Sequence, residues 1–258
     1  MIADLAALAE IGREGLAALF IVFLRVGAAM AVLPAFGEQA VPRRIRLGLA
    51  LGFTIVVAPA VLPLLPPVRT PGGALLILGA EVAAGLVIGL GLRLFVLALQ
   101  TAGAMAAQAT SLAQIFGGSA GVDPQPAIAH LLTIAGLALA VMADLHIRVA
   151  EALIGSYSAF PPGVFPDASL IANWGTFRVA SAFALGFTLA APFVVASLVY
   201  NVALGAINRA MPQLMVAFVG APALTFGGLA VLFLAMPALL EVWLNALHGF
   251  LGDPLASR

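Results

Sequence analysis

Residues 74–114 decide the fold class, and they read ALLILGAEVAAGLVIGLGLRLFVLALQTAGAMAAQATSLAQ. Only two charged residues, Glu81 and Arg93, interrupt this apolar stretch. A helix crosses a bilayer with about 20 residues, so this stretch is longer than one crossing and should tilt, kink or project out of the bilayer. A helix of this length suggests a role in packing against other helices.

The composition of the whole chain favours a membrane location. Of the 258 residues, 63% are hydrophobic and 9% are charged, whereas about a quarter of the residues in a soluble domain are charged. So few charges cannot cover a water-facing surface without leaving large apolar patches. Lipid or other protein must therefore cover the remainder.

Further apolar stretches have roughly the length of a bilayer crossing, namely residues 16–34, 47–65, 127–143, 179–208 and 210–240. Prolines that should break or kink these helices are Pro59, Pro63, Pro192, Pro212, Pro222 and Pro237. We therefore expect an all-α fold, a polytopic membrane-associated bundle of about six long, proline-kinked helices. Since no linker composition divides the chain, residues 1–258 should form a single domain.

The residue inventory excludes several classes of chemistry. All eleven basic residues are scattered arginines in a chain of zero net charge, so nucleic-acid binding is not expected. The chain contains no lysine and no cysteine, which excludes a phosphate-loop lysine, imine chemistry, thiolate chemistry and disulfides. The three histidines lack a metal-ligand spacing. We expect a protein that uses no cofactor or metal and is not an enzyme.

Three charged residues lie well inside apolar stretches: Arg25, Glu81 and Arg93. Exposing any of them to lipid would cost at least ~2.5 kcal/mol, so each should face a partner, a polar cavity or a water-filled path. We therefore expect a polar interior, either within this chain or within an assembly.

A second charged group, Asp144, His146, Arg148 and Glu151, follows the fourth apolar stretch. Ionisable groups at membrane depth suggest a proton relay. Their spacing of three and four residues also allows Arg148 to pair with Asp144 and Glu151 on one helix face. We favour this structural pairing.

Residues 117–121, GGSAG, satisfy the G-x-S-x-G pattern of a serine nucleophile. In hydrolases that pattern joins a strand to a helix, and no strand-like alternation precedes it here. An intramembrane serine protease would instead need a histidine near Ser119, and His130 and His146 are the candidates. The interpretation that we favour is a flexible loop of small residues.

Small residues spaced four apart let helix backbones approach closely. This spacing occurs at Gly48 and Gly52, at Gly85 and Gly89, and at Ala182, Gly186 and Ala190. Because the chain contains 27 glycines, chance explains each motif about as well as a real contact does.

Two blocks of sequence resemble the FliR family of flagellar export proteins and its SctT-type injectisome relatives. Residues 24–49 read LRVGAAMAVLPAFGEQAVPRRIRLGL, and the resemblance rests on Arg25, Pro34, Glu38, Pro42, Arg43 and Arg44. Residues 201–222 read NVALGAINRAMPQLMVAFVGAP, and here it rests on Asn201, Gly205, Asn208, Arg209, Pro212, Gln213, Gly220 and Pro222. Between the blocks the similarity is looser, and residues 117–121 look like an insertion relative to the family.

The resemblance implies a structural, pore-forming subunit of a protein export gate in the bacterial inner membrane, at the flagellar basal body. Such a subunit assembles with FliP and FliQ homologues, works beside FlhB and FlhA homologues, and passes unfolded substrates. It also implies that residues 1–158 are FliP-like, that residues 176–258 form a FliQ-like helical hairpin, and that the central loop plugs the closed pore. Flagellar and injectisome systems both remain open.

The residue types of the central loop suit a plug. Ile115 and Phe116 can supply an apolar seal, and the glycines can supply a hinge because glycine reaches backbone angles closed to other residues. The expected plug is made of Ile115, Phe116, Gly117, Gly118, Ser119, Ala120, Gly121 and Val122.

Two other functions share this composition. A small-solute transporter or channel would show internal symmetry and matched broken helices, and no such repeat is visible. The intramembrane protease, which depends on Ser119, is the second alternative. The arginines at 43, 44 and 46 indicate either that the first loop is cytoplasmic or that it contacts another subunit.

Overall fold

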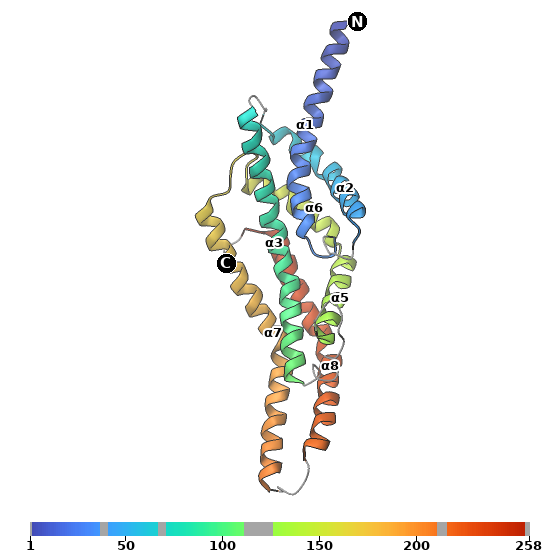
Figure 1. Cartoon of the computed structure of the whole chain (residues 1–258), viewed down its shortest axis with the longest axis vertical. Helices are drawn as coiled ribbons and strands as arrows, with labels where there is room; N and C mark the ends of the chain where they lie inside the picture. The colour runs from blue at the N-terminus through green and yellow to red at the C-terminus, as the bar shows by residue number, and fades with distance from the viewer. Residues whose placement is uncertain (1, 37–40, 67–70, 111–125, 211–215, 256–258) are drawn as a thin grey trace. The chain divides into compact units, whose positions relative to one another are not determined.

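The computed structural model describes residues 2–36, 41–66, 71–110, 126–210 and 216–255, and these residues contain helices and no strand (Figure 1). The elements are α1 (Ile2–Val32), α2 (Arg43–Val61), a short 3₁₀ turn η1 (Leu62–Leu64), α3 (Pro71–Ala109), α5 (Ala127–Met142), α6 (Leu145–Ala159), α7 (Ala168–Ala210) and α8 (Val216–Gly252).

Helices α1, α2, α3, α7 and α8 are long and apolar enough to cross a membrane, and α5 with α6 counts as a sixth span if the two are taken together. The prediction of an all-α polytopic membrane bundle with about six long helices is therefore confirmed. The long third segment is a single helix of 39 residues.

A break between helices lies at Asp144, just after the fourth predicted stretch, and not at a proline. Between α5 and α6 the chain bends by 75°, and Asp144 at the break adopts a left-handed backbone with φ of 60°. Aspartate tolerates this conformation better than most residues. Helix α7 continues through Pro192, and α8 continues through its two internal prolines. The fourth predicted stretch ends at residue 143, beside this break, but bends were expected at prolines. Pro212 lies outside the described residues.

Packing divides the chain into two compact units, and neither unit is one continuous segment. The first unit comprises Met1–Arg93, Asp144–Arg178 and His248–Arg258. The second unit comprises Leu94–Ala143 and Val179–Leu247. Helices α3, α7 and α8 therefore contribute residues to both units.

The core of the first unit is built from α1, α2, α3 and α6, with α1 and α2 packed side by side (Figure 1). Its buried apolar residues include Val22, Val26, Ala29, Leu33, Val57, Val61, Ala84, Ile88, Leu92, Val149 and Leu153. This core surrounds the polar site described below.

The second unit packs around Trp243 of α8, which is 1% exposed. Its indole Nε1 donates a hydrogen bond of 2.8 Å to the carbonyl oxygen of Phe95 on α3. Gly103 lets α3 approach α5 closely, because a Cβ there would overlap Ala129. A buried indole with a satisfied N–H anchors this core.

Large apolar side chains remain exposed on both units. On α8, Phe233 is 82% exposed and Leu234 is 76% exposed. On α1 and α3, Leu16 and Leu75 are also well exposed. An apolar exterior of this kind requires lipid or other subunits to cover it.

Candidate functional site

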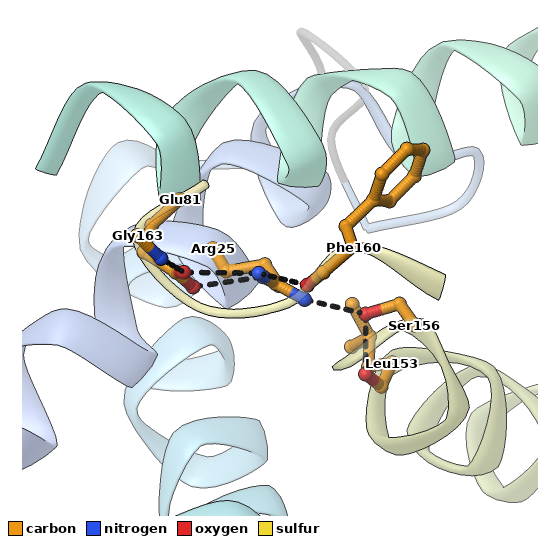
Figure 2. A network of polar contacts seen from close by, with 6 residues as sticks. All are labelled: Arg25, Glu81, Leu153, Ser156, Phe160 and Gly163. Atoms are coloured by element: carbon orange, nitrogen blue, oxygen red, sulfur yellow. Dashed lines mark hydrogen bonds and ion pairs between the residues drawn. The ribbon is translucent and has the colours of Figure 1, made fainter. Parts of the chain in front are cut away.

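Two charged residues from distant parts of the chain meet inside the first unit. Arg25 lies on α1 and is 1% exposed, and Glu81 lies on α3 and is 0% exposed. Arg25 Nε donates to Glu81 Oε2 at 2.8 Å, and Arg25 Nη2 donates to Glu81 Oε1 at 2.9 Å (Figure 2). The fork of the guanidinium matches the two carboxylate oxygens, which is the strongest geometry for such a pair.

The remaining donors of Arg25 reach α6 and the segment that follows it. Nη1 donates to Ser156 Oγ at 3.2 Å, and Nη2 donates to the carbonyl oxygen of Phe160 at 2.9 Å. The guanidinium carbon also lies 3.7 Å from the ring centre of Tyr157. Arginine stacks on aromatic faces through a cation–π attraction. One side chain therefore ties α1 to α3, α6 and the α6–α7 connection.

The partners of Arg25 are themselves held in place (Figure 2). Ser156 Oγ donates to the carbonyl oxygen of Leu153 at 2.6 Å, and the Gly163 amide donates to Glu81 Oε1 at 3.3 Å. Gly163 has a positive φ of 76°, a conformation that glycine adopts at little cost. The serine, the carboxylate and the turn at Gly163 thus form one network around the guanidinium.

A buried ion pair is weak evidence for net stability, and in some proteins it instead selects one arrangement of the chain. Desolvating both charges costs several kcal/mol per ion, and the mutual attraction offsets this cost only when the geometry is good. Breaking such a pair by removing one partner costs about 3–5 kcal/mol. We interpret the network as a structural clamp that selects one arrangement of α1, α3 and α6.

The predicted polar interior exists within the chain for Arg25 and Glu81. Arg25 and Glu81 find each other, whereas Arg93 is partly exposed on α3 and takes no part in this network. Ser156, Tyr157 and the Phe160 carbonyl were not predicted from the sequence. The adjacent serine and tyrosine near the end of α6 could have indicated a polar site. A backbone carbonyl acceptor leaves no pattern in the sequence.

The close approach of α1 and α3 beside the pair depends on glycine. A Cβ at Gly85 would overlap the Arg25 carbonyl oxygen, and a Cβ at Gly89 would lie 2.6 Å from the Ala29 carbonyl oxygen. The Gly85 and Gly89 motif is therefore a real contact. Gly186 of the third motif also packs closely, because a Cβ at this position would lie 3.1 Å from the Ala98 carbonyl oxygen.

The motif at Gly48 and Gly52 behaves differently. At Gly48 and Gly52 of α2, a Cβ would meet nothing within 4 Å in the described part of the chain. Both glycines are exposed. The spacing of small residues alone could not separate this surface from the packed ones.

The expected ion pairs of the Asp144 group do not form among the described residues. Asp144, Arg148 and Glu151 are all exposed, and no ion pair joins them. Asp144 stands at the N-cap of α6 with a left-handed backbone, so its side chain does not leave the chain in the direction of a helical residue. Exposed pairs gain little in any case, and the predicted pairing is wrong.

A further cluster in the first unit holds the end of α8. Trp174 Nε1 donates to the Pro254 carbonyl oxygen at 2.8 Å, and Arg178 Nη2 donates to the same oxygen at 3.3 Å. The Arg178 guanidinium carbon lies 4.9 Å from the ring centre of Phe250. These residues, which were not predicted from the sequence, join the start of α7 to the C-terminal segment.

The family-motif residues separate into two environments. In the first unit, Pro34 is buried after α1, Pro42 is the N-cap of α2, and Arg43 and Arg44 are exposed in its first turn. In the second unit, the exposed residues near the end of α7 are Asn201, Gly205, Asn208 and Arg209, and Pro222 is exposed on α8. Gly220 belongs to α8. Glu38, Pro212 and Gln213 lie outside the described residues.

Asn201 is the member of the second block with a described hydrogen bond. Its Nδ2 donates to the Ser197 carbonyl oxygen at 2.9 Å and to Ser197 Oγ at 3.2 Å. Both acceptors belong to the preceding turn of α7, so this contact is local. The exposure of Asn201, Asn208 and Arg209 leaves these side chains open to neighbours outside the chain.

The predicted plug, Ile115 to Val122, lies outside the described residues, and so does Ser119. The two histidines considered as its partners, His130 and His146, are exposed. Among the described residues, no group of three or more histidine, aspartate or glutamate side chains is arranged to hold a metal ion.

Comparison with known proteins identifies the family. Residues 16–250 match the family described as bacterial export proteins, family 1. The flagellar biosynthetic protein FliR of Caulobacter vibrioides is 36% identical over 228 residues, which cover 86% of this chain and 90% of the relative. The chain belongs to the FliR family.

More distant members match over a similar span. FliR of Escherichia coli is 28% identical over 83% of this chain and 82% of the relative. FliR of Aquifex aeolicus is 26% identical over 92% of both chains. The resemblance stated from the two sequence blocks is confirmed, and this FliR-family chain is a component of a flagellar export apparatus with membrane-spanning helices.

Proposed function

We propose that this FliR-family chain is a structural, pore-forming subunit of the flagellar export gate. It assembles with FliP and FliQ homologues at the basal body in the inner membrane and passes unfolded substrates across that membrane. FlhB and FlhA homologues act beside it. Residues 1–158 serve as the FliP-like part and residues 176–258 as the FliQ-like hairpin.

The observation that carries this proposal is that charged side chains are buried while apolar side chains are exposed. Arg25 and Glu81 are fully buried, while apolar side chains such as Phe233 face outward. A subunit surrounded by other hydrophobic helices and lipid needs this arrangement, because its outer surface is then covered by the assembly. The clamp of the first unit would keep the helices in register during assembly.

Co-expression with FliP and FliQ homologues tests the assembly. We expect the three proteins to co-purify as one complex, and the chain alone to be less stable. A chain that is equally stable alone and binds a small solute would support the transporter and contradict the proposal.

The plug assignment requires a separate experiment. Deleting residues 117–121, or substituting Phe116→Ala, should leave the complex assembled and make the membrane leaky to small solutes, because the apolar seal is lost. Ser119→Ala is the matched control and should change neither property. A tight membrane in the deletion strain, with the complex present, would contradict the plug, and loss of activity from Ser119→Ala alone would support the protease.

A further inference from the structure

A groove of about 470 Å³ lies in the first unit between α1, α2 and α3. This volume falls in the range of small-molecule sites. The walls are mostly apolar and include Phe23, Leu24, Met30, Leu47, Ala50 and Val82. Water gains few hydrogen bonds on such walls, so the groove favours an apolar occupant.

Two arginines line the same groove at the start of α2. Arg43 and Arg46 are three residues apart, which places them on one side of the helix. Arg46 Nε donates to the Val41 carbonyl oxygen at 3.1 Å, and this bond orients its guanidinium. No acidic residue is among the described residues that line the groove. Arg44, between them in the sequence, does not line it.

We propose that this groove binds an anionic phospholipid, with an acyl chain along the apolar walls and the phosphate at Arg43 and Arg46. Arginine binds phosphate oxygens through paired N–H groups. Basic pockets between membrane helices are known to hold anionic headgroups. An apolar groove with a positive end and no described acidic residue in its lining complements a lipid of net negative charge. The proposal rests on the membrane location of the chain and does not depend on the pore function.

Arg44 gives the proposal a matched control. The purified full chain would be titrated with phosphatidylglycerol and with phosphatidylcholine of the same acyl chains, and bound lipid would be counted by native mass spectrometry. Arg43→Gln and Arg46→Gln should each weaken phosphatidylglycerol binding about fivefold. Arg44→Gln removes the same charge from the same helix turn and should leave binding unchanged. Equal losses in all three variants, or equal binding of the two lipids, would overturn the proposal.

A substitution at the rim of the groove tests whether the apolar walls are needed for lipid binding. Ala31 is exposed and lines the groove, so Ala31→Trp should fill it and abolish phosphatidylglycerol binding while both arginines remain. Inorganic phosphate should not compete with the lipid; full competition would indicate a site for free phosphate and overturn the proposal. In the assembled complex, a photo-crosslinker at position 31 should capture lipid, and capture of a polypeptide instead would assign the groove to a partner helix.

Discussion

Arg25 and Glu81 form a two-bond ion pair, with bonds of 2.8 and 2.9 Å, across 56 positions of sequence. Both side chains are almost completely excluded from solvent. A charge in that position cannot lose its partner without either leaving the core or changing its ionisation. The pair therefore couples the packing of α1 on α3 to the pairing of the two charges.

Removing one member of the pair should be worse than removing both. Arg25→Leu leaves Glu81 buried without its partner and should destabilise the chain by about 3–5 kcal/mol. The double variant Arg25→Leu with Glu81→Leu should recover most of that loss relative to the two single variants, because no unpaired charge remains. Thermal unfolding in detergent, analysed as a double-mutant cycle, measures the coupling. A double variant as unstable as the sum of the singles would contradict this account, as would full stability and assembly of Arg25→Leu.

The glycines of α2 and α3 should respond in opposite ways to the same substitution. Gly85→Ala forces a Cβ onto the Arg25 carbonyl oxygen and should destabilise the chain by about 1–3 kcal/mol. Gly48→Ala meets open space and should be neutral, or stabilising by up to about 1 kcal/mol, because alanine favours the helix. Unfolding of the isolated chain distinguishes the two. If Gly48→Ala nevertheless blocks co-purification with FliP and FliQ homologues, α2 packs against another subunit at that point.

Tyr157 should contribute through its ring and not through its hydroxyl. Its Oη is buried near Glu81 but forms no hydrogen bond of good geometry in the described part of the chain, so Tyr157→Phe should be neutral or slightly stabilising. Tyr157→Leu removes the aromatic face under Arg25 and should cost about 1–2 kcal/mol more than Tyr157→Phe. Thermal unfolding of both variants gives the comparison. A large loss in Tyr157→Phe would show that the hydroxyl has a partner in the assembled protein.

The cap of α7 should depend on pH. Asp167 Oδ1 accepts hydrogen bonds from the Ser169 hydroxyl at 2.6 Å and from the Ser169 and Leu170 amides at 2.7 and 3.2 Å. The Ser169 hydroxyl first, and then the two amides, hold the pKa of this carboxyl below its usual value, which is about 3.9. Because the folded pKa is the lower one, the cap stabilises the helix above about pH 4 and loses its effect as pH falls through the folded pKa.

Carbon-13 NMR of labelled aspartate should place the Asp167 titration below that of an unstructured aspartate. Asp167→Asn keeps an acceptor oxygen but does not titrate, so protection of the Ser169 and Leu170 amides should become independent of pH through this range. Asp167→Ala should reduce their protection at every pH. An unshifted Asp167 titration would show that the cap is not formed in solution.

The sequence by itself determined that this protein needs apolar surroundings, and it determined the class of its fold. With 63% hydrophobic and 9% charged residues, the chain needs elements whose backbone groups are satisfied internally, and apolar runs of about 20 residues indicate that these elements are helices. It also determined that Arg25 and Glu81 need partners, because an isolated charge in an apolar helix is too costly. The two motif blocks predicted the family, because a family motif is also a local pattern of residues.

Only the tertiary structure decided which groups meet. Gly48 and Gly85 belong to identical small-residue patterns, yet one faces open space and the other touches the Arg25 carbonyl. Arg25 takes Glu81, Ser156 and the Phe160 carbonyl as partners, and the last of these has no signature in the sequence. The bend at Asp144 likewise has no proline to announce it. Periodicity and composition act within one helix, whereas the identity of a buried partner depends on which helices pack together, and that depends on the whole chain.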